Sequence, residues 1–437
     1  MQTQSAIVSR QMLWPFILLT ICFAAWGTAA NMTDPLVKVF SKTFSMSALQ
    51  SALVQFSYYG AYFCLALPAA MINRRFNYKT GLLVGLAMAA CGALLFYPAS
   101  QTMLYSHFLL ALFILAGGLS ILETSANPYV MQLGCEQTAT RRLNLAQAFN
   151  PVGTNIGVFL AATLILPNLN QADSAGRALM SEAQLKTVVS AELNAVMVPY
   201  VGMACCLILL WLCIFCSRSP VTVAKAATPA RKLKKTFQHL YQNKHYRFGV
   251  LAQFFNVGAQ TCVWTYTIGY TMEALNTTEV TGGQVLQYSM LVFLVSRFIM
   301  TWLMRFINAA KLLRFMALGA AVLCFVVATQ VNLAGVIALV AISSCLSLMF
   351  PTIYGTALEG LGDDAKVGAA GLVMAILGGA FLPLIQAATI DAFNTAVSFV
   401  VPLICFLVVA LYGHHSKVAA HFVKQTDIKL HAGQLQD

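Results

Sequence analysis

The chain has 437 residues, of which 59% are hydrophobic and only 9% are charged, and its mean hydropathy is +0.75. Soluble globular proteins carry roughly 25% charged residues, so this chain has too few charges to cover a water-soluble surface of its size. This composition excludes a cytosolic enzyme, a disordered regulator and a secreted disulfide scaffold. It indicates an all-α, polytopic membrane protein.

Apolar runs long enough to cross a bilayer, which needs about 20 residues, recur from one end of the chain to the other. We expect twelve transmembrane helices, at 12–32, 49–72, 81–98, 104–132, 144–167, 194–216, 247–272, 284–307, 312–330, 333–357, 367–390 and 394–413. A basic linker at 217–246 separates a first six-helix half, 1–216, from a second half with a C-terminal tail, 247–437.

The distribution of Lys and Arg predicts the orientation. With the N-terminus inside, the outer segments hold only Lys38, Lys42, Arg177 and Lys186, although the chain has 26 basic residues and a net charge of +12. Because cytoplasmic loops are enriched in Lys and Arg, we expect both termini and the central linker to be cytoplasmic. The same placement explains the net charge without nucleic acid, so we expect no nucleic-acid partner.

Three charged residues in or beside the predicted spans stand out. A charge at the bilayer centre costs at least roughly 2.5–3.5 kcal/mol on insertion scales, so such residues are functional candidates. Glu123 lies well inside span four, and its structural alternative is a buried ion pair. Asp34 follows span one, where it is either a coupling acid or an ordinary acid at a helix end. Arg297, in span eight, is the one intramembrane cation.

Polar and aromatic residues recur in several spans, most of them at helical spacing. They are Trp26 and Asn31 in span one; Glu123 and Asn127 in span four; Asn144, Gln147, Asn150 and Thr154 in span five; and Gln253, Asn256, Gln260 and Trp264 in span seven. Amides in membrane helices also bond neighbouring helices. Stripes of three or four polar residues in several helices fit a water-filled cavity better.

The chemistry of these stripes favours a neutral polyhydroxyl substrate. Carboxylates and amides bond hydroxyls, and Trp rings cover the C–H face of a pyranose. An anionic substrate would need cations, for which Arg297 is the candidate, whereas a cationic drug could use Glu123 with aromatic residues. The sequence has no phosphate-binding loop for ATP. We therefore expect proton coupling, with sodium as the alternative, and no metal site, cofactor or catalytic residue.

At these residues the sequence resembles the bacterial L-fucose:proton symporter family, which includes glucose/galactose transporters and lies within the major facilitator superfamily. The stretches that carry the resemblance are Trp26 to Asp34 (WGTAANMTD), Leu122 to Pro128 (LETSANP), Leu143 to Asn150 (LNLAQAFN) and Leu251 to Trp264 (LAQFFNVGAQTCVW). The resemblance implies two six-helix halves that work by alternating access around a central cavity. It also implies a bacterial inner-membrane protein that is functional as a monomer.

The resemblance also implies roles for individual residues. Asp34 matches the acid implicated in proton coupling, and Glu123 matches the acid that links sugar recognition to protonation. The residues that match the sugar site or the cavity lining are Trp26, Asn31, Gln147, Asn150, Gln260 and Trp264. Asn127, four residues after Glu123 on the same span, is a further candidate for sugar binding.

The chain departs from the fucose symporter pattern at a few positions. Ala30 stands where that protein has a second Asn, Phe350 stands where it has a Tyr, and span seven reads FFNVGAQ rather than FCYVGAQ. L-Fucose is therefore the leading substrate, with D-galactose, D-arabinose or another hexose behind it. Two further hypotheses are a proton-driven exporter of drugs or metabolites from the same superfamily, and a membrane sensor of sugars.

Overall fold

A computed structural model describes residues 7–43, 48–102, 104–165, 180–217 and 233–433. Within these ranges the regular elements are all helices, and ten of them are long and apolar enough to cross a membrane. Two more, α2 (Ala48–Arg75) and α10 (Lys244–Leu275), are 28 and 32 residues long but less apolar. Counting α2 and α10 gives the predicted twelve. The chain is a multi-pass, all-α membrane protein.

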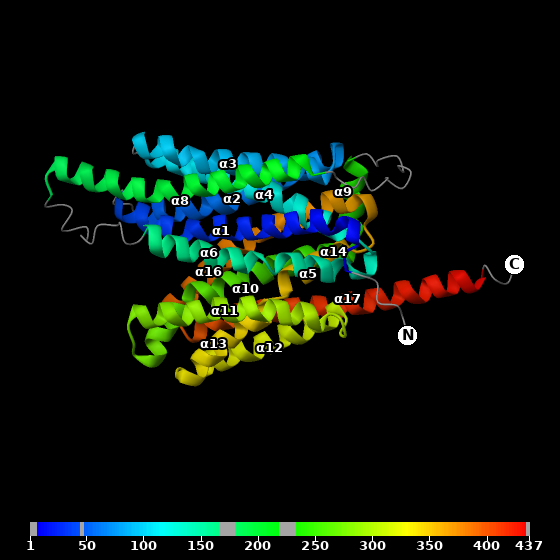
Figure 1. Ribbon diagram of the computed structural model, residues 1–437. Helices are drawn as coiled ribbons and strands as arrows, with labels where there is room; N and C mark the ends of the chain where they lie inside the picture. Colours follow the sequence, from blue (N-terminus) through cyan, green and yellow to red (C-terminus); the bar gives the residue numbers. More distant parts are fainter. Residues whose placement is uncertain (1–6, 44–47, 103, 166–179, 218–232, 434–437) are drawn as a thin grey trace. The chain divides into compact units, whose positions relative to one another are not determined.

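The chain divides into two compact units, and the first contains 1–229 together with Ala369–Leu377. Its α1 packs along α6, and its α3 packs along α4 and α8 (Figure 1). Its helices are α1 (Leu13–Thr43), α2, α3 (Tyr78–Thr102), α4 (Tyr105–Gln132), α5 (Ala139–Gln147), α6 (Asn150–Leu160), the π-helical turn Ala161–Ile165, and α8 (Glu182–Cys216).

The second unit contains Ala230–Gly368 and Gly378–Asp437. In it α10 packs against α16 and α17, and α12 packs against α13 and α17 (Figure 1). Its helices are α9 (Leu233–Gln242), α10, α11 (Glu279–Leu303), α12 (Ala309–Thr329), α13 (Leu333–Leu346), α14 (Met349–Leu358), α16 (Gly378–Ala392) and α17 (Val400–Gly433). The unit also holds the start of α15 (Ala365–Met374), which from Ala369 onwards belongs to the first unit. Most of the predicted basic linker, 218–232, lies outside the described residues.

The predicted fifth and tenth spans are each broken into two helices. Proline has no backbone N–H, so the carbonyl four residues before it loses its helical partner. Pro151 follows the break between α5 and α6, and Pro351 follows the break between α13 and α14. The apolar pattern predicts the two spans but not these breaks, because it continues across both prolines.

The contact between α1 and α6 depends on glycine. Gly27 lies against the backbone carbonyl of Asn150, and Gly153 lies against that of Ala24, so a Cβ at either glycine would overlap a carbonyl oxygen. Close backbone approach through small residues is typical of membrane helices. At this contact the Thr28 hydroxyl donates to the Gly153 carbonyl at 3.0 Å.

We expect Gly153→Ala to destabilise the folded protein by about 1–3 kcal/mol or more, because the added methyl group meets backbone that has no rotamer to change. The melting temperature and monodisperse yield of detergent-purified protein measure this effect. The matched control is Gly202→Ala on α8, where a Cβ would meet open space. Equal melting temperatures for the two variants would contradict the close packing of α1 on α6.

Candidate functional site

Glu123 is the most unusual side chain of the first unit. It lies in α4 with 0% exposure, and neither carboxylate oxygen has a hydrogen-bond partner among the described residues. The amide of Asn127, one turn further along α4, is close to the carboxylate but falls short of hydrogen-bond geometry. An unpaired charge is costly to bury, so these surroundings suit the neutral, protonated acid. The buried ion pair considered as its structural alternative is not formed within the described part of the chain.

Aromatic residues of α1 and α2 are hydrogen-bonded to one another, and one of them also bonds to α4, the helix of Glu123. The Trp26 indole N–H donates to the Tyr62 hydroxyl at 2.7 Å, and Tyr58 donates to the same hydroxyl at 3.4 Å. The Tyr62 backbone carbonyl accepts a hydrogen bond at 3.0 Å from the hydroxyl of Ser120, which lies about one turn before Glu123 on α4. Trp26, predicted to cover a sugar ring, is therefore held by a residue that lies near the predicted coupling acid.

The amides of α4 and α5 form a buried pair. Gln147 Nε2 donates to Asn127 Oδ1 at 2.7 Å, and both side chains are almost fully buried. Asn127 follows Glu123 by one turn, so this pair lies next to the carboxylate on α4. The structure thus brings Gln147 of α5 together with two predicted site residues of α4, Glu123 and Asn127.

The other predicted amides of this unit bind between α1 and α6. Asn31 Nδ2 donates to the Thr154 hydroxyl at 3.0 Å and to the Gly27 carbonyl at 2.9 Å. Asn150 makes only a long contact, 3.5 Å, to the Phe23 carbonyl, and is half-buried. Asn31 therefore connects helices, whereas Asn150 retains much of its hydrogen-bonding capacity.

Asp34 lies within α1, which continues to Thr43, so its backbone is helical rather than part of a connecting loop. Its side chain lies outside the described part of the structure. Its role in proton coupling stays a prediction.

In the second unit, Trp264 lies on α10 and its indole N–H donates to the Ser343 hydroxyl of α13 at 3.2 Å. Its ring packs edge-on against Phe293, with 5.1 Å between the ring centroids. Gln260, one turn before Trp264, is half-buried. These contacts orient the indole while leaving part of its surface exposed.

Arg297 is engaged by the protein itself. Its Nε donates to the carbonyl of Ser347, and its guanidinium lies 4.7 Å from the centroid of the Phe293 ring. That carbonyl is the one released by Pro351, at the C-terminal end of α13, where a helix favours a cation. Arg297 therefore stabilises the helix break, which weakens the case for an anionic substrate.

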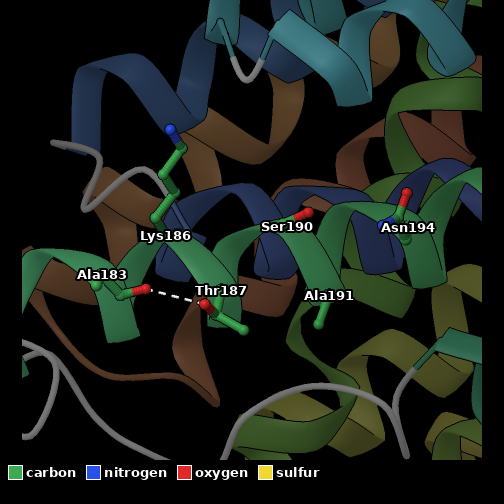
Figure 2. Close-up of a pocket in the computed structure, with 6 residues that line it drawn as sticks. All are labelled: Ala183, Lys186, Thr187, Ser190, Ala191 and Asn194. Atoms are coloured by element: carbon green, nitrogen blue, oxygen red, sulfur yellow. Dashed lines mark hydrogen bonds between the residues drawn. The ribbon is translucent and has the colours of Figure 1, made fainter.

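A cavity of about 560 Å³ lies elsewhere, along the N-terminal part of α8. Figure 2 shows its lining residues, all from this one helix: Ala183, Lys186, Thr187, Ser190, Ala191 and Asn194. None of the predicted sugar or proton residues lines it. It is a hollow along one helix, without the acid and amide groups described above.

Comparison with known proteins gives the family. The model of the Major Facilitator Superfamily matches residues 16–381. The L-fucose-proton symporter of Haemophilus influenzae is 40% identical over 418 residues, covering 93% of this chain and 97% of that protein. This chain belongs to the L-fucose:proton symporter family. Its similarity to a glucose/galactose transporter of Brucella abortus is 36% identity over 399 residues, covering 90% and 92% of the two chains.

A solved structure agrees with this family assignment. The crystal structure of the major facilitator transporter FucP in the outward conformation matches this symporter-family chain with a TM-score of 0.86 and 34% identity. The match covers 92% of this chain and 98% of that chain. The recognition of the family from the sequence, and the prediction of an all-helical major facilitator fold, are confirmed.

Sequence analysis did not single out Tyr62 or Ser343, which hold the two predicted tryptophans. For Tyr62 a signal existed, since Tyr58 and Tyr62 are four residues apart on one face of α2. The polar stripe predicted for span five also changes at the helix break. Gln147 pairs with α4, whereas Asn150 and Thr154 contact α1.

Proposed function

We propose that this protein is a proton-coupled monosaccharide importer, a symporter that works by alternating access. The observation that carries the proposal is Glu123, a fully buried carboxylate without a partner in the described chain, one turn from the buried Asn127–Gln147 amide pair. A group that can gain and lose a proton thus lies beside groups that bind hydroxyls.

These residues suggest a sequence of events. Protonation of Glu123 removes the cost of a buried charge, and the neutral acid can donate or accept hydrogen bonds with a sugar. Asn150 and Gln260 add amide donors and acceptors, while Trp26 and Trp264 provide faces for the sugar ring. Release of the proton restores the negative charge on Glu123, which is unfavourable in these closed surroundings. Sugar and proton are therefore released on the same side of the membrane.

The leading substrate is L-fucose or a related hexose. Similarity to both L-fucose-proton symporters and glucose/galactose transporters supports a monosaccharide. The departures at Ala30, Asn256 and Phe350 make the stereochemistry of the sugar a property to measure. We propose a location in the bacterial inner membrane, with both termini cytoplasmic because of the distribution of Lys and Arg. We also propose that the protein acts as a monomer, without enzymatic activity.

Uptake of radiolabelled sugars by cells that lack their own permeases tests this function. The proposal predicts accumulation of L-fucose or a related hexose above its external concentration, and loss of accumulation when an uncoupler is added. An exporter would lower the internal concentration, and a sensor would leave it unchanged. Either result across the whole panel of sugars would contradict the proposal.

The amides of the first unit predict two different mutant phenotypes. Asn150→Ala should weaken sugar affinity by one to two decades, with little loss of stability, because its 3.5 Å contact contributes little to folding. Gln147→Ala should lower both affinity and melting temperature, because it leaves buried Asn127 without its 2.7 Å partner. Binding and melting measured on the same purified protein separate these effects. Unchanged sugar affinity in Asn150→Ala would show that Asn150 contributes to helix packing and not to sugar binding.

A further inference from the structure

Two amides of α10 are buried without a hydrogen-bond partner in the described part of the chain. Gln253 and Asn256 both have 0% exposure. None of their four polar side-chain atoms makes a hydrogen bond with a residue that the structure describes. By contrast, Gln386, another fully buried amide of this unit, donates through Nε2 to the Ser398 hydroxyl at 3.1 Å, and only its Oε1 lacks a partner among the described residues.

Such a pair requires a physical explanation. Most buried polar side-chain atoms in proteins have a partner, and leaving one unpaired destabilises the fold. Leucine or methionine of similar size would fill the same space without unsatisfied groups. A fold that keeps both amides at one turn of one helix therefore gives up stability at this position. That pattern is typical of binding sites, where polar groups wait for a ligand.

The position of the pair supports this interpretation. Gln253 and Asn256 share the face of α10 that carries Gln260 and Trp264. Near the N-terminal end of α10 this face contacts α14, because Gly249 of α10 lies against Ala357 of α14. At its far end Trp264 donates to Ser343 of α13. The unpaired amides lie on the stretch between these two anchored contacts.

The chemistry of the pair selects a class of ligand. Each amide offers an oxygen that accepts and a nitrogen that donates two hydrogen bonds, which suits hydroxyl groups because these both donate and accept. The described residues include no cluster of three or more His, Cys, Asp or Glu side chains that could hold a metal ion. Arg297, the cation predicted in span eight, donates to the backbone carbonyl of Ser347.

We propose that Gln253 and Asn256 bind hydroxyl groups of the transported sugar, and that Asn256 helps to determine which sugar is accepted. This inference rests on the proposed function of sugar transport. The ligand reaches the amides in a conformation in which this face of α10 is open, and an ordered water molecule is the competing occupant.

The variants Asn256→Leu and Gln253→Met keep the approximate volume and remove the polar atoms. We expect each to raise the melting temperature of purified protein by a few degrees, because an unpaired buried amide is lost. We also expect each to weaken the binding of L-fucose and D-galactose about tenfold or more, measured by calorimetry on the same preparation. Stability and affinity should therefore change in opposite directions.

Gln386→Met is the matched control, because it removes a buried amide that has a partner. It should lower the melting temperature and leave sugar affinity unchanged. Deoxy analogues of the bound sugar, each lacking one hydroxyl, provide a second measurement. The analogue that lacks the hydroxyl bound by Asn256 should bind the parent and Asn256→Leu with equal affinity.

Three results would overturn the inference. Unchanged sugar affinity in both α10 variants would show that the amides bind an ordered water molecule rather than the sugar. A fall in melting temperature together with affinity, or failure of both variants to fold, would assign them to packing. Failure of the parent protein to bind any sugar would instead overturn the proposed function, and this inference with it.

Discussion

Glu123→Gln should abolish proton-driven accumulation of sugar while preserving sugar binding and exchange between the two sides of the membrane. Glutamine resembles the protonated acid in size and hydrogen bonding but cannot titrate. The carboxylate of Glu123 has no partner to lose among the described residues, so the melting temperature should not fall. Concentrative uptake and counterflow of radiolabelled sugar, measured in the same proteoliposomes, check both parts of this expectation.

Glu136→Gln provides the matched control, because Glu136 is an exposed acid just beyond the C-terminal end of α4. It should accumulate sugar as the parent does. Full concentrative uptake by Glu123→Gln at neutral pH would show that proton coupling occurs elsewhere. Loss of counterflow together with accumulation would instead indicate a damaged sugar site.

Asp34→Asn should abolish active uptake while leaving the folded protein in the membrane. Asp34 belongs to α1, the helix that also carries Trp26 and Asn31. Removal of its charge should leave folding intact, because asparagine has nearly the same shape. The measurement is initial uptake rate across a range of external pH, normalised to the amount of protein in the membrane.

Asp391→Asn, at an exposed position near the end of α16, controls for the general loss of an acid near a helix end. It should behave as the parent at every pH. If Asp34→Asn also matched the parent, Asp34 would be an acid without a role in coupling, and Glu123 would be the remaining candidate.

The sequence predicts the helical spans well because each one is a long apolar run, and a bilayer permits few alternatives to a helix. α10 shows the limit of hydropathy alone. Like α2, it is less apolar than the other spans, and in α10 this is because of the same amides that indicate its function, Gln253, Asn256 and Gln260 among them. The composition of the chain indicates a membrane protein, whereas the helical spacing of these amides indicates that α10 is a span with one polar face.

Contacts between helices could not be predicted in the same way. Pro151 and Pro351 mark the two helix breaks in the sequence, but only the structure shows that Arg297 binds the carbonyl released by Pro351. The polar stripes identified residues with functional chemistry without distinguishing paired amides from unpaired ones. Asn31 has a partner in Thr154, and Asn256 has none in the described chain. That difference depends on tertiary packing, which one sequence does not contain.

The most direct test of proton–sugar symport is the pH of a weakly buffered, sodium-free suspension of de-energised cells that contain the protein and lack other sugar permeases. Addition of L-fucose, or of the hexose that the uptake panel selects, should make the medium more alkaline as protons enter with the sugar. An uncoupler should abolish this change, and Glu123→Gln should not show it. Entry of radiolabelled sugar with no alkalinisation, or only after sodium is added, would contradict proton coupling.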